Sequence, residues 1–338
     1  MVTRVGAIGL GEFALIQMDG WVDRSDVRIA AGSDISADAR EAFEVRYDRP
    51  TYEDYEAMFD EADLDAVFIA TPHTLHYQHA VDALDRDLHV LLEKPMVTET
   101  GHAVDLVRRA DERELVLTVG YQRHCHPAYQ AARELLQDGR IGDVHMASCH
   151  IATDWLPNAE GTWRANPDLS GGGQLFDCGS HLLDALLWTT DAEPGQVAAT
   201  MDYRDYDVDV NTALAATLEG PDGPITASIG ISGDGNQWEE SLVIWGTEGL
   251  LRIEDGLTIE EGDSQEEQFF DTGADWSVVH KKMNGFVDAV QGKRDNPIPG
   301  ELCLQVAALT DAACQAVESG QTVDVSALIE EARVENET

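Results

Sequence analysis

Lysine is scarce in this sequence of 338 residues, where 64 acidic side chains stand against 22 basic ones and the formal net charge is −42. The only lysines are Lys94, Lys281, Lys282 and Lys293. So acidic a surface repels the phosphates of nucleic acids, which we exclude as partners. Such a charge is typical of disordered chains, but 43% hydrophobic residues suffice for a core. We expect a folded protein from a halophile, because a Debye length of about 3 Å at 1 M salt screens the repulsion.

The sequence also lacks the marks of a secreted, metal-binding or membrane protein. Its cysteines are odd in number and form no C-x-x-C pair, which argues against disulfides and structural zinc. They are Cys125, Cys149, Cys178, Cys303 and Cys314. No run approaches the roughly 18 apolar residues of a membrane span, and the opening segment MVTRVGAIGLGEF has no secretory-signal pattern. We therefore predict a cytoplasmic protein with no membrane partner and no metal.

Short apolar runs alternate with amphipathic stretches in the first third of the chain. The apolar runs cover 4–10, 27–33, 64–72, 89–95 and 115–122. Such continuous runs are typical of strands buried on both faces. Helical patterns lie between them, at 36–46, 52–62, 76–86 and 100–114. The alternation predicts an α/β fold with a doubly wound parallel sheet, and the chain length favours two domains, at 1–122 and 123–338.

The first strand is followed by a glycine-rich turn. Gly9, Gly11 and Ala14 form a G-x-G-x-x-A pattern before a helix. Glycine lets the backbone approach a pyrophosphate, whose charge then lies at the helix N-terminus. Asp34 ends the second apolar run, where a carboxylate accepts hydrogen bonds from the adenine ribose. The combination predicts a bound dinucleotide and favours NAD, although Ser33 and its turn could accommodate the extra phosphate of NADP.

Strand patterns predominate after residue 122. They run from VHMASCHIATD to LLRIEDGLTIEEGD, and GPDGP at 220–224 predicts a hairpin turn. We expect a C-terminal α+β domain built on a large, mostly antiparallel open sheet, followed by helices at about 276–293 and 301–319. The stretch 260–268 is expected to form an acidic surface loop, and the tail from Glu330 to be frayed.

The segment GGGQLFDCGSHLLDALLW (171–188) has apolar residues at helical spacing, interrupted by Asp177, His181 and Asp184. Spacings of four and three residues place these groups on one side of a helix. Alone, such an Asp and His are more often an intrahelical pair. Alcohol oxidation needs a base with a pKa near neutrality and a cation that stabilises the alkoxide, and His181 and Lys94 suit these two roles. Asp177 would hydrogen-bond the substrate or raise the basicity of the imidazole, whereas Asp184 is expected to be structural.

Several motifs occur together in the order GAIGLGEFA, VFIATPHTLHYQHA, LLEKPM, GYQRHCHPAY, GRIGDV, SGGGQLFDCGSHLLD and GTEGLL. Over nearly the whole chain they resemble the glucose-fructose oxidoreductase and inositol dehydrogenase (Gfo/Idh/MocA) family. The most specific are E-K-P at 93–95 and G-x-x-x-D-x-G-x-H at 173–181. The resemblance implies a Rossmann domain, a second domain with a broad sheet, NAD(P)-dependent oxidation of sugars, inositols or related polyols, and homodimers or homotetramers joined through that sheet.

The resemblance also implies site residues. The catalytic residues would be Lys94, Asp177 and His181, with the division of proton transfer between the lysine and the histidine open. The substrate-binding residues would be Lys94, Trp163, Arg164, Asp177 and His181. The dinucleotide would be held by Gly9, Leu10, Gly11, Glu12, Phe13, Ser33, Asp34, Thr71, Pro72, His73, His76, Glu93, Lys94 and Gln122. His73 departs from the family, which commonly has asparagine there, and arginine is usual near His124.

Other interpretations stay open at this point. His73, His76 and His79 have three-residue spacing, but side chains at the start of a helix diverge by about 100° per residue, which disfavours a three-ligand metal site. Trp163 and Arg164 could equally be a packed tryptophan beside a surface arginine. The chain could also be a dinucleotide-binding sensor without turnover, or a lyase or hydrolase that uses bound NAD transiently.

Overall fold

The computed structural model describes residues 2–270 and 276–336, which group by proximity into two compact units. The first unit comprises the described parts of Met1–Met96, Asp105–Cys125 and Thr272–Glu301. The second comprises those of Val97–Val104, His126–Asp271 and Leu302–Thr338. The grouping differs from the two continuous segments expected at 1–122 and 123–338, because a late helix, α10 (Ser277–Val290), packs on α1 (Glu12–Met18). None of the helices in the described ranges is both long and apolar enough to cross a bilayer.

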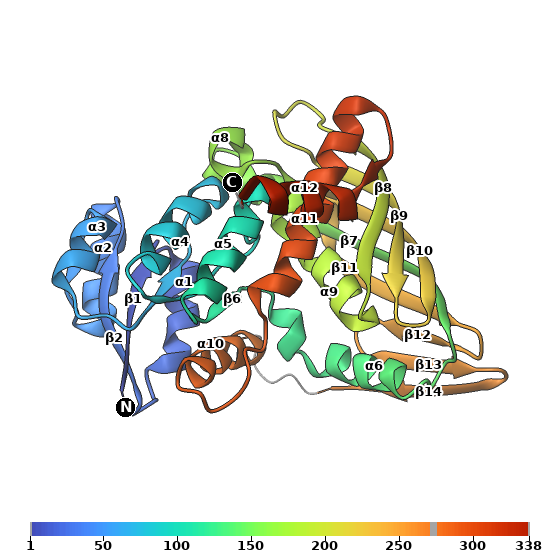
Figure 1. The fold of residues 1–338 in the computed structure, drawn as a ribbon, viewed down its shortest axis with the longest axis horizontal. Helices are drawn as coiled ribbons and strands as arrows, with labels where there is room; N and C mark the ends of the chain where they lie inside the picture. Colours follow the sequence, from blue (N-terminus) through green and yellow to red (C-terminus); the bar gives the residue numbers. More distant parts are fainter. Residues whose placement is uncertain (1, 271–275, 337–338) are drawn as a thin grey trace. The chain divides into compact units, whose positions relative to one another are not determined.

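The first unit contains a six-stranded parallel sheet (Figure 1). In order across the sheet, the strands are β3 (Thr51–Tyr52), β2 (Val27–Ser33), β1 (Thr3–Ile8), β4 (Ala66–Ile69), β5 (His89–Leu92) and β6 (Leu117–Val119). All residues of β4 are buried, as in strands covered on both faces. The order confirms the predicted doubly wound sheet, in which ligands bind at the carboxyl ends of the strands where the order reverses, here between β1 and β4.

The remaining elements of this unit connect and cover the strands. They are α1, η1 (Asp19–Trp21), α2 (Ala37–Tyr47), α3 (Tyr55–Glu61), η2 (His73–Leu75), α4 (His76–Leu84), the part of α5 (Thr100–Glu112) from Asp105 on, η3 (Gln122–Cys125) and α10. Local chemistry sets their starts: the Ser36 hydroxyl accepts from the N–H of Ala39 at the start of α2, as an N-cap does. Trp21, Phe68 and Phe286 are buried in one core cluster, so α10 contributes to the core beneath β4.

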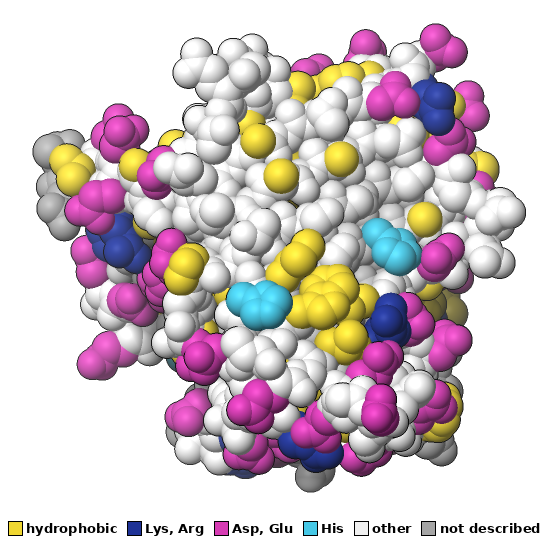
Figure 2. Space-filling view, turned by 90° about the vertical axis from the view of Figure 1, so that its right-hand side faces the viewer, with side chains coloured by type: hydrophobic (Ala, Val, Ile, Leu, Met, Phe, Trp, Pro, Cys, Tyr) yellow, Lys and Arg dark blue, Asp and Glu magenta, His cyan; other side chains and the backbone are white. Residues whose placement is uncertain are grey.

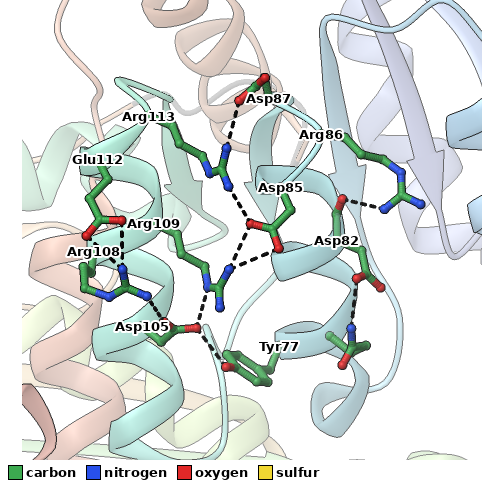
Figure 3. A network of polar contacts seen from close by, with 11 residues as sticks. Tyr77, Asp82, Asp85, Arg86, Asp87, Asp105, Arg108, Arg109, Glu112 and Arg113 are labelled. Atoms are coloured by element: carbon green, nitrogen blue, oxygen red, sulfur yellow. Dashed lines mark hydrogen bonds and ion pairs between the residues drawn. The ribbon is translucent and has the colours of Figure 1, made fainter. Parts of the chain in front are cut away.

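A network of ion pairs joins α4 to α5 (Figure 3). Asp105 is buried at its centre, and its carboxylate accepts from Arg109 Nε at 2.6 Å, Arg108 Nη2 at 2.5 Å and the Tyr77 hydroxyl at 2.8 Å. Arg109 also donates to Asp85 at 2.9 Å. Two of the few basic side chains in the chain therefore pair with one buried carboxylate. A buried charge needs such pairing to offset the loss of its hydration.

The second unit contains a nine-stranded open sheet. In order across the sheet, the strands are β14 (Ser264–Gln268), β13 (Leu257–Glu261), β12 (Leu250–Ile253), β11 (Asp234–Gly246), β7 (Val144–Asp154), β10 (Gly223–Ser232), β9 (Asn211–Gly220), β8 (Glu193–Asp202) and β15 (Val323–Asp324). Only the β7–β10 pair is parallel among the described pairings, so the predicted, mostly antiparallel sheet is confirmed.

Helices of the second unit complete its core. They are α6 (Pro127–Gln137), α7 (Leu156–Ala159), η4 (Trp163–Ala165), α8 (Pro167–Ser170), η5 (Leu175–Gly179), α9 (Ser180–Thr190), α11 (Gly300–Ser319) and α12 (Val325–Asn336). Helix α9 is buried along nearly its whole length and contacts β7 (Figure 1). The strict alternation of buried and exposed residues in β9 shows that the sheet has one covered face and one open face.

Two local expectations were wrong. The stretch 260–268 is no loop but belongs largely to the hairpin of β13 and β14 at the sheet edge, where polar side chains face water on both sides. Residues 330–336 of the expected frayed tail belong to α12, which buries Ile329 and Ala332, and residues 337–338 lie outside the described residues. In both places the many charged residues leave no clear hydrophobic period, so the sequence pattern did not predict the regular backbone.

Candidate active site

The glycine-rich turn of the first unit has the geometry of a phosphate cradle. Gly9 has φ +86°, and a Cβ there would lie 2.5 Å from the main-chain oxygen of Ala70. Gly11 is the N-cap of α1, and a Cβ added to it would meet nothing within 4 Å. The first glycine is thus required by backbone packing, while the second leaves the helix start open to a ligand. A pyrophosphate fits this turn on both counts.

Asp34 lies where the adenine ribose is expected. Its Oδ2 accepts from the N–H of Leu10 and its Oδ1 from that of Ser36, each at 2.8 Å. A carboxylate has about four acceptor positions, so these two bonds orient Asp34 while two positions can serve ribose hydroxyls. Ser33, the last residue of β2, is buried beside it. Arg40 folds back from α2 and donates to the main-chain oxygen of Asp34 at 2.7 Å, which brings a cation next to the site.

His76 connects the ends of two neighbouring strands. Its Nδ1 lies 2.8 Å from the oxygen of Pro95 and its Nε2 lies 2.9 Å from that of Thr71. Both partners are acceptors, and burial lowers the pKa of His76 while these two contacts oppose that shift. The ring therefore positions the Thr71–Pro72 turn against the segment that follows β5. His73, in the adjoining η2, is buried with its ring 5.8 Å from that of His76.

Lys94 follows β5 and precedes Pro95, and the peptide bond between them is cis. Its main-chain N–H donates to Oε2 of Glu93 at 3.2 Å. The other oxygen of Glu93 accepts from Nζ of Lys282 at 2.6 Å. Burial raises the pKa of the Glu93 carboxyl, but the adjacent Lys282 outweighs burial and holds that pKa below its ordinary value. Glu93 is therefore an ionised group beside the main chain of Lys94, and its expected contact with the dinucleotide stays a prediction.

The remaining dinucleotide candidates lie at the surface of the first unit or at its strand ends. Glu12 is exposed in the first turn of α1. Phe13 is 47% exposed, with its ring edge-on to Trp276 at 5.4 Å. Gln122 opens η3, just after β6. The structure brings Gly9–Gly11, Ser33 and Asp34 together at the ends of β1 and β2, and places Gln122 beyond the end of β6.

In the second unit, a π-helical turn precedes α9. The helix expected after the three glycines begins with a wider turn, because residues 175–179 form η5. Asp209 holds the start of this turn: its carboxylate accepts from the N–H groups of Gly173 at 2.7 Å and Leu175 at 2.8 Å. A Cβ on Gly173 would lie 1.9 Å from the oxygen of Asp209, so only glycine fits there. Burial raises the pKa of Asp209.

Asp177 projects from η5 into a cluster of donors. Its Oδ2 accepts from Trp155 Nε1 at 2.8 Å and from Arg164 Nε at 3.0 Å. The Arg164 guanidinium carbon also lies 4.6 Å from the ring centroid of Trp163, in a cation–π arrangement. Three of the predicted substrate residues, Asp177, Trp163 and Arg164, are therefore assembled in one place by the loop before the helix.

His181 and Asp184 lie on α9, one turn apart. Both side chains are buried, with 7% and 2% of their surface exposed. His181 follows Asp177 by four residues across the π-helical turn, which supplies the extra backbone width at that point. Asp184 lies deeper, and burial together with its carboxylate raises the pKa of the Cys303 thiol.

The histidine series offers no shared ligand site. His79 points toward Thr71 Oγ1, 3.1 Å from its Nδ1, and burial lowers its pKa to about 4. His124 instead faces the oxygen of Pro297 at 3.3 Å. Within residues 2–270 and 276–336, no three His, Cys, Asp or Glu side chains are arranged to hold a metal ion.

Four residues of this site were missed by the sequence analysis: Lys282, Asp209, Trp155 and Arg40. Lys282 and Asp209 act on Glu93 and on the start of η5 from 189 and 34 residues away along the chain. Only the fold reveals such pairings. Arg40 had a local signal, since it lies six residues after Asp34, on the first turns of the next helix.

Sequence profiles identify both parts of the chain. Residues 3–121 match a profile described as "Oxidoreductase family, NAD-binding Rossmann fold". Residues 129–252 match one described as "GFO/IDH/MocA C-terminal domain".

Individual relatives agree with these profiles. The chain is 30% identical over 261 residues to a D-xylose 1-dehydrogenase [NADP(+)] of Haloarcula marismortui, covering 74% of this chain and 72% of that protein. It is 25% identical to a dTDP-3,4-didehydro-2,6-dideoxy-alpha-D-glucose 3-reductase of Saccharopolyspora spinosa, covering 94% and 98%. Its fold is similar to that of a scyllo-inositol dehydrogenase from Lactobacillus casei solved with NAD(H) and scyllo-inositol, with a TM-score of 0.80, 22% identity and coverage of 96% and 100%. The chain belongs to the Gfo/Idh/MocA family of NAD-binding oxidoreductases.

Proposed function

We propose that this protein is an NAD(P)-dependent dehydrogenase that acts on a hydroxyl-bearing carbon of a sugar, inositol or related polyol. The observation that carries the proposal is that polar neighbours hold both candidate groups: Lys94 at the end of β5, and Asp177 at the start of the helix that carries His181. Both lie in a chain of a family whose relatives are named as sugar dehydrogenases and reductases. Polyol hydroxyls suit a site with a carboxylate, an imidazole and an arginine, which together accept and donate hydrogen bonds.

The chain's own residues would handle the proton and the charge. His181 takes the proton of the substrate hydroxyl, because imidazole titrates near neutral pH. Lys94 stabilises the negative charge that develops on the same oxygen. Asp177 and Arg164 bind neighbouring hydroxyl groups, with Trp163 against the face of the ring.

The bound dinucleotide would supply the acceptor of the hydride. Gly9, Gly11 and Asp34 would hold it, and the Asp34 carboxylate favours NAD because it repels the additional phosphate of NADP. Arg40, which donates to the main chain at Asp34, adds a cation that could serve that phosphate. The relative named as NADP(+)-dependent makes the choice of cofactor worth measuring directly.

The open face of the nine-stranded sheet is suited to self-association. Many outward side chains of β8, β9 and β10 are small and uncharged, among them Ala198, Ala213, Ala215, Thr226 and Ser228. Figure 2 shows this side of the molecule with acidic groups mainly at its margins. In a chain of net charge −42 such a face is exceptional, and it supports a homodimer or homotetramer joined through the sheet.

The acidic surface and the cysteines support a location of this protein in a reducing, salty cytoplasm. None of the five cysteines forms a disulfide, which suits a compartment where disulfides are reduced. The excess of carboxylates would be screened at molar salt, where a folded chain of this charge is most stable.

A substrate screen tests the proposed activity. Purified protein is assayed with aldoses, inositols and sugar acids, with NAD and NADP in parallel, in molar salt. We expect reduced cofactor to be released in proportion to oxidised substrate for at least one compound. Conversion of substrate without net reduced cofactor would instead favour lyase or hydrolase chemistry, and binding of NAD without any conversion would favour a sensor.

A further inference from the structure

Lys282 is the most deeply buried charge among the described residues of the first unit. Only 1% of its side chain is exposed, and its Nζ lies 2.6 Å from Oε1 of Glu93 and 2.6 Å from Oε1 of Gln17. The neighbouring Lys281 is exposed. In a chain with four lysines, one is therefore enclosed against the residue that immediately precedes Lys94.

The surroundings of Glu93 are shaped to hold its carboxylate in one orientation. Oε1 is taken by Lys282, and Oε2 accepts the main-chain N–H of Lys94 at 3.2 Å. Gly120, at the end of β6, faces the carboxylate, and a Cβ there would lie 2.9 Å from its atoms. A larger residue at 120 would displace Glu93. Lys282, the main chain of Lys94 and Gly120 together therefore restrict the Glu93 side chain to one position.

Stability alone does not account for this pair. A buried ion pair loses its hydration, and replacement by apolar residues of similar volume is often neutral or stabilising. An ion pair does fix the orientation of the carboxylate, because one of its oxygens must face the ammonium. Here that orientation points the second oxygen at the N–H of Lys94.

We propose that Lys282 is a positioning residue: through Glu93 it fixes the main chain at Lys94, so that the Lys94 ammonium is held ready for the substrate. The inference rests on the proposed function for the role of Lys94, but the Lys282–Glu93–Lys94 linkage can be tested without any substrate. In this proposal Lys282 acts only through Glu93.

The test compares three single variants of α10 in the full-length protein. Lys282→Met removes the ammonium at nearly constant volume. Lys281→Met makes the same chemical change at an exposed neighbour. Met283→Ala, at a fully buried core position, lowers stability without changing the groups around Glu93. Hydrogen exchange by mass spectrometry reports on peptides spanning residues 93–97, where Pro95 has no amide, and turnover and the dissociation constant for NADH are measured in parallel.

We expect Lys282→Met to speed exchange at residues 93–97 at least tenfold and to lower kcat at least tenfold, while the dissociation constant for NADH changes less than threefold. Met283→Ala should lower Tm but keep exchange at 93–97 and kcat within threefold of the parent, and Lys281→Met should match the parent throughout. If Lys282→Met fails to fold, the double variant Glu93→Gln/Lys282→Met, which buries no unpaired charge, takes its place with the same expected exchange.

The outcomes separate the two proposals. Exchange and kcat in Lys282→Met that merely match those of Met283→Ala overturn the positioning role, even if the parent enzyme oxidises sugars. A parent protein without dehydrogenase activity overturns the proposed function, while the exchange data still decide whether Lys282 fixes the chain at Lys94.

Discussion

Arg164 and Asp177 form an ion pair, with Nε of the arginine 3.0 Å from Oδ2 of the aspartate. The same oxygen accepts from Trp155, so one carboxylate oxygen receives two hydrogen bonds. Asp177 is thereby held as a charged acceptor and is a poor candidate for the base that removes a proton. We propose that it orients a hydroxyl group of the substrate, with Arg164 as the partly exposed member of the pair.

Replacing Arg164 by leucine should affect binding more than folding. The arginine side chain is 38% exposed, so its ion pair contributes at most about 1 kcal/mol to stability. We expect KM for the best substrate to rise about tenfold, with Tm within about 2 °C of the parent. Steady-state kinetics and thermal melts measure both, and Arg252→Leu, at a similarly half-buried arginine on β12, is the matched control. A large drop in Tm with unchanged KM would make Arg164 a structural residue.

Removing the proposed base or cation should abolish turnover. Lys94→Ala and His181→Ala are each expected to lower kcat at least about a hundredfold, because each removes an interaction made in the transition state. Affinity for NADH, measured by fluorescence titration, should stay within about threefold in His181→Ala. Near-normal kcat in either variant would take that residue out of the mechanism.

Cofactor preference should respond to Asp34. In Asp34→Ala the repulsion of the NADP phosphate is lost, and we expect the ratio of kcat/KM for NADP to that for NAD to rise about tenfold or more. Adding Arg40→Ala should reverse most of this gain, since Arg40 supplies the cation nearest to the site. A ratio that does not move in Asp34→Ala would show that another group selects the cofactor.

Acid sensitivity should be traceable to His79. Its folded-state pKa of about 4 is lower than the ordinary value of 6.5, because burial disfavours the charged ring. The unfolded chain therefore binds the proton first, and the stabilising contribution, present above pH 6.5, is lost as pH falls toward 4. We expect His79→Phe to lose about 2 kcal/mol less unfolding free energy than the parent between pH 7 and pH 4.5, measured by urea denaturation at constant salt. Equal losses in both proteins would rule out this assignment.

The network of Figure 3 predicts unequal costs for two charge removals. Asp105→Asn leaves Arg108 and Arg109 without their shared, buried acceptor and should cost about 2 to 4 kcal/mol of unfolding free energy. Glu112→Gln removes a 59% exposed partner of Arg108 and should cost about 0.5 kcal/mol or less. Chemical denaturation resolves the difference, and equal values would show that burial does not set the strength of this network.

The sequence was most informative where hydrophobic periodicity and glycine spacing coincide. The continuous apolar runs of β1, β2 and β4 and the turn at Gly9 and Gly11 were predictable because parallel strands and phosphate turns depend on local sequence. The hairpin β13–β14 was not, since an edge exposed to water has no apolar period to detect. The π-helical turn at 175–179 was hidden as well, because a four-residue spacing between Asp177 and His181 also fits an α-helix.

Long-range polar pairs lay beyond such analysis altogether. Nothing near Lys282 in the sequence indicates that it faces Glu93, and nothing near Asp209 indicates that it holds Gly173. Both pairs join elements far apart along the chain, and they are decided by packing rather than by any local preference.

The distance in sequence between Glu93 and Lys282, 189 residues, has a consequence for synthesis. At about 5–20 residues per second, a ribosome needs roughly 10 to 40 s to deliver the ammonium after the carboxylate has been made. During that interval the nascent nucleotide-binding half has a carboxylate without its cation. A fragment ending near residue 125 would remain in that state permanently, so this half is expected to require the later helix before it can mature.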